Sequence, residues 1–363
     1  MEDEDLKPDK VTYMNMLNAC ANAGSLEWAR EIHTLAMKDG LLSDISVGNA
    51  LVSTYAKCGS FRDAQCVFEQ MSKRNVISWN AIIGGLAQHG RGHEALLLFE
   101  KMKQEEFKPD TVTFVSVLSA CSHAGLLEEG REFFSCMAQD FGIAPTIEHY
   151  GSMVDLLGRA GQIDEAEALI KSMPLQANTK ILGALLGACR IHGNILVAER
   201  AAESSLKLDP DNAAVYVLLA HMYAAAGMWE SATKMRRLME QKGIAKEPGK
   251  SWIEVEGKLH HFVAGDRSHP QAEDIYAELD RLTLQMKRDG YAPDTQLVLH
   301  DVDEKEKEMA VCHHSEKLAI AYGLISTPPG SLIRIFKNLR VCADCHSATK
   351  FITRIVGREI VAR

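Results

Sequence analysis

Several features that mark common protein classes are missing from this sequence of 363 residues. No apolar run reaches the roughly 20 residues that a membrane-spanning helix needs, so we expect no membrane partner. Basic residues are not in excess, because 40 Lys and Arg stand against 49 Asp and Glu, giving a net charge of −9. This balance argues against a broad, non-specific polyanion binder, although it leaves room for a groove that recognises bases. The nine cysteines are irregularly spaced, unlike a secreted disulfide framework, and indicate a reducing compartment.

The acidic opening segment also lacks the apolar core of a signal peptide. We expect residues 1–9 to be the end of a preceding repeat, and both ends of the sequence to be cut. The sequence contains no Gly-rich phosphate loop and no GxSxG motif.

What the sequence does contain is an internal repeat. Seven glycines recur at intervals of 31 to 36 residues: Gly24, Gly59, Gly90, Gly125, Gly161, Gly193 and Gly227. Five residues after each comes a small residue: Ala29, Ala64, Ala95, Gly130, Ala166, Ala198 and Ala232. This pattern predicts helix–turn–helix units in which the glycine ends the first helix and the small residue allows close helix packing. Such pairs stack into a solenoid.

Two motifs near the C-terminal end carry candidate chemistry: His314-Ser315-Glu316 and Cys342-Ala343-Asp344-Cys345. One His and two Cys supply three ligands for a catalytic zinc, whose fourth position stays open for water. Zinc-dependent base deaminases share this H-x-E…C-x-x-C arrangement, with the Glu moving protons. Their Pro before the first Cys is replaced here by Val341. The alternatives are a structural zinc site or two buried cysteines.

The elements expected around these motifs place them together. The pattern predicts a hairpin over 252–263, a helix over 314–322, a strand over 332–336, and a second helix from Cys342 to about 356. Two helix N-termini could therefore meet at one metal ion, and their dipoles would favour ionised thiolates.

These segments together resemble the plant pentatricopeptide-repeat proteins of the P-L-S subclass. Tetratricopeptide repeats share the helical plan, but their Trp…Leu-Gly…Tyr pattern is absent. The resemblance covers nearly the whole chain and rests on repeat segments 13–17 and 79–83, a PG box at 248–255, and DYW-domain motifs at 265–270, 314–321 and 337–346.

The resemblance implies an all-α helical-repeat solenoid followed by a small α/β zinc-binding, cytidine-deaminase-like domain. It divides the chain into the end of a preceding repeat (1–9), five repeats of types L, S, P, L and S (10–178), E motifs (179–246), and a PG box with a partial DYW deaminase domain (247–363).

Proteins of this family bind single-stranded RNA in plant organelles and direct C-to-U editing, one base per repeat. The fifth and last residues of a repeat contact the base. By this correspondence Asn49 with Asn75 implies a pyrimidine leaning to C, and Asn80 with Asp110 implies U. The alternative is that Asn49 and Asn80 merely cap or pack at helix starts.

The other three repeats are weaker base-recognition candidates. Asn178 is the last residue of a repeat whose fifth residue, Gly151, has no side chain. Met14 and Val115 are apolar and cannot hydrogen-bond a base edge.

The resemblance also assigns roles in the deaminase. His314, Cys342 and Cys345 match the ligands of a catalytic Zn²⁺, and Glu316 matches the general acid/base of an RNA cytidine deaminase. His346 matches a ligand of a second, structural zinc site. The family completes that site with a tail that ends in Asp-Tyr-Trp, so we expect a C-terminally truncated domain.

Three functions remain open at this point. The first is an editing enzyme of the mitochondrion or plastid. The second is a catalytically inactive RNA-binding specificity factor that relies on a deaminase supplied in trans, with or without other editing factors. The third is a protein–protein scaffold of the tetratricopeptide kind, which the paired polar residues disfavour.

The remaining cysteines and histidines are expected to pack or to be solvated. Packing is predicted for seven cysteines: Cys20, Cys58, Cys66, Cys121, Cys136, Cys189 and Cys312. His313 is the nearest rival to His314 as a ligand, and the His-x-Glu spacing favours His314. The histidines in or after the hairpin, with no assigned role, are His260, His261 and His269.

Overall fold

The computed structural model describes residues 8–244, 248–295, 303–339 and 341–362. The chain divides into two compact units, Met1–Ala245 and Lys246–Arg363. Residues 1–7 of the expected preceding repeat lie outside the described residues.

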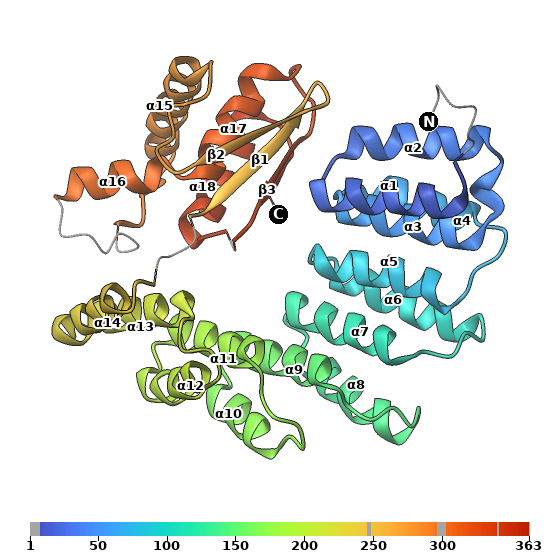
Figure 1. Ribbon diagram of the computed structural model, residues 1–363, viewed down its shortest axis with the longest axis horizontal. Coiled ribbons are helices and arrows are strands. Elements are labelled where there is room, and N and C mark those ends of the chain that lie inside the picture. The colour runs from blue at the N-terminus through green and yellow to red at the C-terminus, as the bar shows by residue number, and fades with distance from the viewer. Residues whose placement is uncertain (1–7, 245–247, 296–302, 340, 363) are drawn as a thin grey trace. The chain divides into compact units, whose positions relative to one another are not determined.

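The first unit consists of helix–turn–helix pairs that follow one another along the chain (Figure 1). In its described part the fourteen α-helices are α1 Lys10–Ala23, α2 Leu26–Lys38, α3 Ile45–Lys57, α4 Phe61–Gln70, α5 Val76–Gln88, α6 Gly92–Gln104, α7 Thr111–Ala124, α8 Leu127–Gln139, α9 Ile147–Arg159, α10 Ile163–Ser172, α11 Thr179–His192, α12 Ile195–Leu208, α13 Ala213–Ala225 and α14 Trp229–Gln241. A short 3-10 helix, Leu41–Ser43, joins α2 to α3.

The repeated glycines and alanines act in the structure as the pattern predicts. All seven marker glycines have left-handed φ angles, between 69° and 78°, at the turn inside each pair. A side chain would be strained there, which explains why glycine recurs. The small residues five positions later are all buried.

Stacking of the pairs buries one core cluster that runs from Tyr13 of α1 to Leu156 of α9. The first helices pack in a row, α1 on α3, α3 on α5, α5 on α7, α7 on α9 and α9 on α11. Each second helix from α2 to α12 packs on its own first helix and on that of the next pair, and α14 packs on α13. The prediction of a helical-repeat solenoid is therefore confirmed.

The cysteine predictions for this unit hold with one exception. Cys20, Cys121 and Cys189 are buried at equivalent positions of their helices, as is Cys58. Cys66 is exposed, so the prediction that it packs was wrong. The buried stripe of α4 is formed by Ala64, Val67 and Phe68, which leaves Cys66 on the opposite face.

Phe99 on α6 provides a test of this core. Its ring is 1% exposed and contacts Phe114 and Phe133 edge-on, with centroids 5.8 and 5.5 Å away. Phe99→Ala is expected to lower the free energy of unfolding by about 3–5 kcal/mol, since it leaves a cavity. Leu97→Ala on the same helix is the control, because Leu97 is 69% exposed. If urea denaturation showed the same loss of unfolding free energy in both variants, the buried packing of Phe99 would be contradicted.

The second unit contains a four-stranded sheet with the order β2-β1-β3-β4. The strands are β1 Lys250–Val255, β2 Lys258–Val263, β3 Ile333–Lys337 and β4 Ile360–Ala362. Strand β1 runs antiparallel to β2 and β3, whereas β3 and β4 are parallel. Glu256 and Gly257, both with positive φ, form the two-residue turn of the β1–β2 hairpin, which confirms the predicted hairpin.

Four helices accompany the sheet: α15 Ala272–Arg288, α16 Glu304–Cys312, α17 Ser315–Ser326 and α18 Ala343–Val356. Helix α17 packs against β1, β2 and β3 on one side and against α15 and α18 on others, so it lies at the centre of the unit. Gly323 permits the approach, because a Cβ there would lie 2.7 Å from Ile253 Cδ1. The predicted α/β unit is confirmed.

Across the described ranges of both units, none of the helices combines the length and the apolar character that crossing a membrane would require.

Candidate functional site

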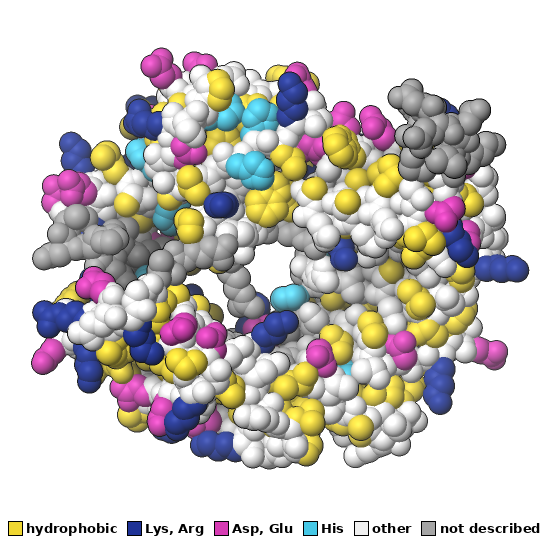
Figure 2. Space-filling model, in the orientation of Figure 1, with side chains coloured by type: hydrophobic (Ala, Val, Ile, Leu, Met, Phe, Trp, Pro, Cys, Tyr) yellow, Lys and Arg dark blue, Asp and Glu magenta, His cyan; other side chains and the backbone are white. Residues whose placement is uncertain are grey.

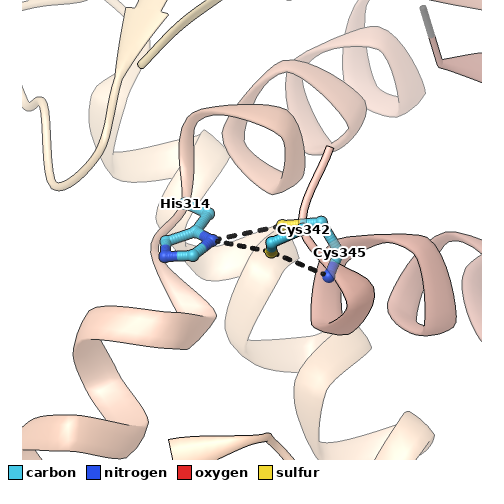
Figure 3. A group of neighbouring side chains, drawn as sticks. All are labelled: His314, Cys342 and Cys345. Atoms are coloured by element: carbon cyan, nitrogen blue, oxygen red, sulfur yellow. Dashed lines mark hydrogen bonds between the residues drawn. The ribbon is translucent and has the colours of Figure 1, made fainter. Parts of the chain in front are cut away.

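Three predicted ligands meet where helices α17 and α18 begin. His314 is the residue that caps α17, Cys342 caps α18, and Cys345 lies in the first turn of α18 (Figure 3). His314 Nδ1 lies 3.3 Å from Cys345 Sγ and 3.5 Å from Cys342 Sγ. The three ligand atoms lie within 4.8 Å of one another, and no other such group of three or more His, Cys, Asp or Glu occurs among the described residues.

The local electrostatics distinguish the two thiols. Hydrogen bonds from the Cys345 thiol and from His314 lower the pKa of Cys342 to about 4, although burial opposes this shift. The backbone N–H of Cys345 also donates to Cys342 Sγ, at 3.3 Å. The same Cys342 contact, together with burial and the Glu316 charge, raises the pKa of Cys345. One imidazole, one thiolate and one thiol that a metal would deprotonate form a donor set that fits zinc.

Glu316 lies beside this cluster as the second residue of α17. Its side chain is 1% exposed and forms an ion pair with Lys337 of β3. Its other oxygen accepts a hydrogen bond from Ser315 Oγ at 3.1 Å. Burial alone would raise the pKa of Glu316, but the Lys337 ammonium outweighs it and holds the pKa below its usual range. Glu316 is therefore an ionised carboxylate in a buried position.

Sequence reasoning missed the charged residues that support the two motifs. Lys317 pairs with Asp344 at 2.6 Å, and both side chains are 1% exposed. Lys337, the partner of Glu316, was also missed. The sequence signal for these residues was a charge where burial was expected. Lys317 directly precedes an apolar run, and Asp344 lies between two expected ligands.

The other predicted histidines are not members of this group of three. His346 is exposed on α18. The ring of His313 packs edge-on against Tyr276, 5.0 Å away between centroids. His260 and His269 form a packed group with Tyr322, where His260 contacts His269 Nε2 at 3.0 Å and the Tyr322 hydroxyl at 3.1 Å. Figure 2 shows histidine side chains gathered over the β1–β2 hairpin.

In the first unit, the predicted base-recognition residues form hydrogen-bonded pairs between successive repeats. Asn49 lies inside α3, and its Nδ2 donates to Oδ1 of Asn75, the residue that caps α5, at 3.3 Å. Ser78 Oγ donates to Asn49 Oδ1 at 2.6 Å. Asp44 caps α3, so Asn49 is not a helix cap, but its exposure of 8% agrees with the alternative that it packs near the start of the helix.

The next pair repeats this arrangement. Asn80 Nδ2 donates to Oδ1 of Asp110, the cap of α7, at 2.9 Å, and Thr113 Oγ1 donates to Asn80 Oδ1 at 2.6 Å. Asn80 likewise does not cap its own helix, whose cap is Asn75. Asn178 caps α11 by accepting from Ile181 N at 3.0 Å, and Gly151 offers it no side-chain partner.

Apolar side chains beside these positions were also missed. The second residues of α1, α5 and α7 are Val11, Ile77 and Val112, which are 53%, 62% and 55% exposed. Residues three apart on a helix share a face, so Ile77 lies on the same face as Asn80. The repeat spacing could have revealed these three residues, because they occupy the same position in their repeats. The face drawn in Figure 2 carries acidic and basic side chains interspersed.

Comparison with known families gives matches along most of the chain. Models described as a pentatricopeptide repeat domain, the PPR repeat family and the PPR repeat match residues 1–57, 74–123, 49–76, 112–140 and 148–175. The E motif matches 192–254, the E+ motif 259–286, and the DYW family of nucleic acid deaminases 290–363.

Curated relatives from Arabidopsis thaliana match nearly all of the chain. A chloroplastic pentatricopeptide repeat-containing protein is 50% identical over 99% of this chain and 40% of its own length. The chloroplastic proteins CRR2 and ELI1 are 47% and 46% identical over 100% and 98% of this chain, and 55% and 57% of their own lengths. The chain spans about half the length of the curated relatives that it matches.

Among solved structures, the maize pentatricopeptide repeat protein PPR10 is similar at a TM-score of 0.46 and 19% identity, over 88% of this chain and 52% of that one.

Proposed function

Since the chain belongs to the pentatricopeptide-repeat proteins that carry E, E+ and DYW-deaminase segments, we propose that it is an organellar RNA-editing factor. Its repeats bind single-stranded RNA sequence-specifically, and its second unit converts a target cytidine to uridine. The observation that carries the proposal is the meeting of His314, Cys342 and Cys345 beside the buried carboxylate of Glu316. The mitochondrion or the plastid is the proposed compartment, and the names of three relatives say chloroplastic.

RNA recognition is proposed to use the paired polar residues together with the exposed apolar ones. Ile77 and Val112 are large and exposed at equivalent positions of successive repeats, and Asn80 lies three residues after Ile77. A base held by apolar contacts on its faces would present its edge to Asn80 and Asp110. Specificity then comes from hydrogen bonds and packing. Because the chain is acidic, its affinity for RNA is expected to depend only modestly on salt concentration.

For the chemical step, His314, Cys342 and Cys345 would hold Zn²⁺, which when bound supplies the Lewis acidity that makes water a nucleophile at neutral pH. Glu316 accepts a proton from the attacking water at its carboxylate and returns it to the base, so that water and cytidine give uridine and ammonia. Lys337 keeps Glu316 ionised for the first of these transfers. A single-stranded substrate avoids the cost of extruding the base from a duplex.

Asp110→Asn tests base recognition by one repeat. A carboxylate can only accept, which suits the N3–H of uracil, whereas an amide can also donate to N3 of cytosine. The variant is expected to change the preference at one RNA position from U toward C, by about tenfold for one good hydrogen-bonding pair. Helix α7 should remain stable, since Asn and Asp cap helices equally well. Selection from a randomised RNA pool, followed by binding titrations, measures the change.

Asp44→Asn is the matched control for that experiment. Asp44 caps α3 at the equivalent position, but its partner position holds the apolar Met14. An unchanged preference in Asp110→Asn, or the same change in Asp44→Asn, would contradict base recognition by the Asn80–Asp110 pair.

The deaminase proposal is tested by C-to-U conversion on an RNA library, using the zinc-loaded chain. Conversion at a reproducible cytidine supports it. Selective RNA binding without conversion would favour a specificity factor that relies on a deaminase in trans. The absence of selective binding and of conversion would overturn both.

A further inference from the structure

A buried network of charged and polar groups joins the two turns that carry the metal-ligand candidates. Lys317 Nζ donates to Asp344 Oδ2 at 2.6 Å, to the Tyr291 hydroxyl at 2.9 Å and to the Val311 carbonyl at 3.3 Å. An ammonium has three donors, so every one of them is used. No other lysine is buried among the described residues.

Asp344 closes the network from the other side. Its Oδ1 accepts from the Tyr291 hydroxyl at 2.7 Å and from the backbone N–H of Asp294 at 3.0 Å. Tyr291, which is 5% exposed, therefore touches both charged partners, and the three side chains form a closed ring of hydrogen bonds. A fully satisfied buried network of this kind rigidifies its surroundings.

The network lies next to the ligands in the sequence and between their helices in space. Lys317 follows His314 by three residues on α17, and Asp344 lies between Cys342 and Cys345 on α18. The same first turn of α17 is also joined to β3, by the ion pair between Glu316 and Lys337. The turn bearing His314 is thus fixed in two directions.

We propose that Lys317, Asp344 and Tyr291 form a strut that sets the position of His314 relative to the two cysteines. This inference rests on the proposed zinc site. A buried ion pair is weak evidence for stability, since apolar residues of similar volume often stabilise as well. Its hydrogen bonds are directional, however, and metal ligands must be held to within about 0.5 Å. The three strut residues are positioning residues that act through the ligands.

The test is the zinc affinity of the full chain with Lys317→Met/Asp344→Asn. This double variant removes both charges together, and the amide oxygen that replaces the carboxylate can still accept from Tyr291 and Asp294. We expect the apparent dissociation constant for zinc, measured by competition with a chromophoric chelator, to rise by about 10–100-fold. Visible absorption of bound Co²⁺ should change as well, because it reports the geometry of the ligands.

The matched control is Lys287→Met/Glu308→Gln, which removes the ion pair between α15 and α16 in the same unit. These side chains are 41% and 36% exposed, so zinc affinity should change by less than about twofold. Urea unfolding in excess chelator separates loss of folding from loss of ligand geometry. Tyr291→Phe, which keeps the ion pair and removes one hydroxyl, is the second variant and should weaken zinc binding to a smaller extent.

The outcomes distinguish the strut from the proposed function. If zinc affinity and Co²⁺ absorption are unchanged in the double variant, the strut is overturned, even where the free energy of unfolding has changed. If the double variant does not fold, unchanged zinc affinity in Tyr291→Phe overturns it. A wild-type chain that binds no zinc overturns the proposed metal site and the strut with it.

Discussion

Glu316→Gln is expected to reduce C-to-U conversion by about 10²–10⁴-fold, the range that general acid–base catalysis contributes. The amide has nearly the same shape as the carboxylate but cannot accept a proton from water or return it to the base. Zinc binding should persist, since His314, Cys342 and Cys345 are untouched. Single-turnover conversion of a target RNA, with zinc content measured in the same preparation, checks both parts.

The control for this substitution is Glu273→Gln. Glu273 is the second residue of α15, as Glu316 is of α17, but it is exposed. It should leave conversion unchanged. The variant at Glu316 also leaves Lys337 without its partner at a site where that lysine is 10% exposed, so unfolding is measured alongside conversion. A folded, zinc-loaded Glu316→Gln chain that converts RNA at the wild-type rate would remove Glu316 from the mechanism.

The parts of the fold that could be predicted are those in which a short stretch determines its own conformation. Glycines that recur every 31 to 36 residues predicted the left-handed turns, and small residues five positions later predicted close packing. The His-x-Glu and Cys-x-x-Cys motifs predicted two helix starts, and the structure places His314 within 3.5 Å of both thiols. Within each glycine turn and within each of the two motifs, the informative residues lie within one or two helical turns of each other.

What could not be predicted depends on partners far apart in the chain. Lys317 and Asp344 are 27 residues apart, and neither motif indicates that the two side chains meet. The exposure of Cys66 depends on which face of the ten-residue helix α4 is buried. The contacts of Asn49 and Asn80 required the register of one repeat against the next, because Ser78 and Thr113 lie on the first helix of the following pair.

Cys345→Ala is expected to weaken zinc binding by more than about a hundredfold. Loss of a residue that hydrogen-bonds to a metal ligand typically lowers metal affinity by about 10–100-fold. Loss of a ligand itself should lower the affinity further. Cys345 is 1% exposed and its Sγ is the closer of the two sulfur atoms to His314 Nδ1. Chelator competition and metal analysis measure the effect, and C-to-U conversion should fall below detection.

Cys312→Ala controls for the loss of a buried thiol. Cys312 is 6% exposed at the end of α16 and lies outside the group of three ligands, so its removal should leave zinc affinity unchanged. The core of the second unit is built from apolar residues of α15, α17, α18 and the sheet, and both variants should keep that fold without metal. A Cys345→Ala chain with wild-type zinc affinity would exclude Cys345 as a ligand. Zinc loss in Cys345→Ala with unaltered RNA selection would separate the metal centre from the repeats.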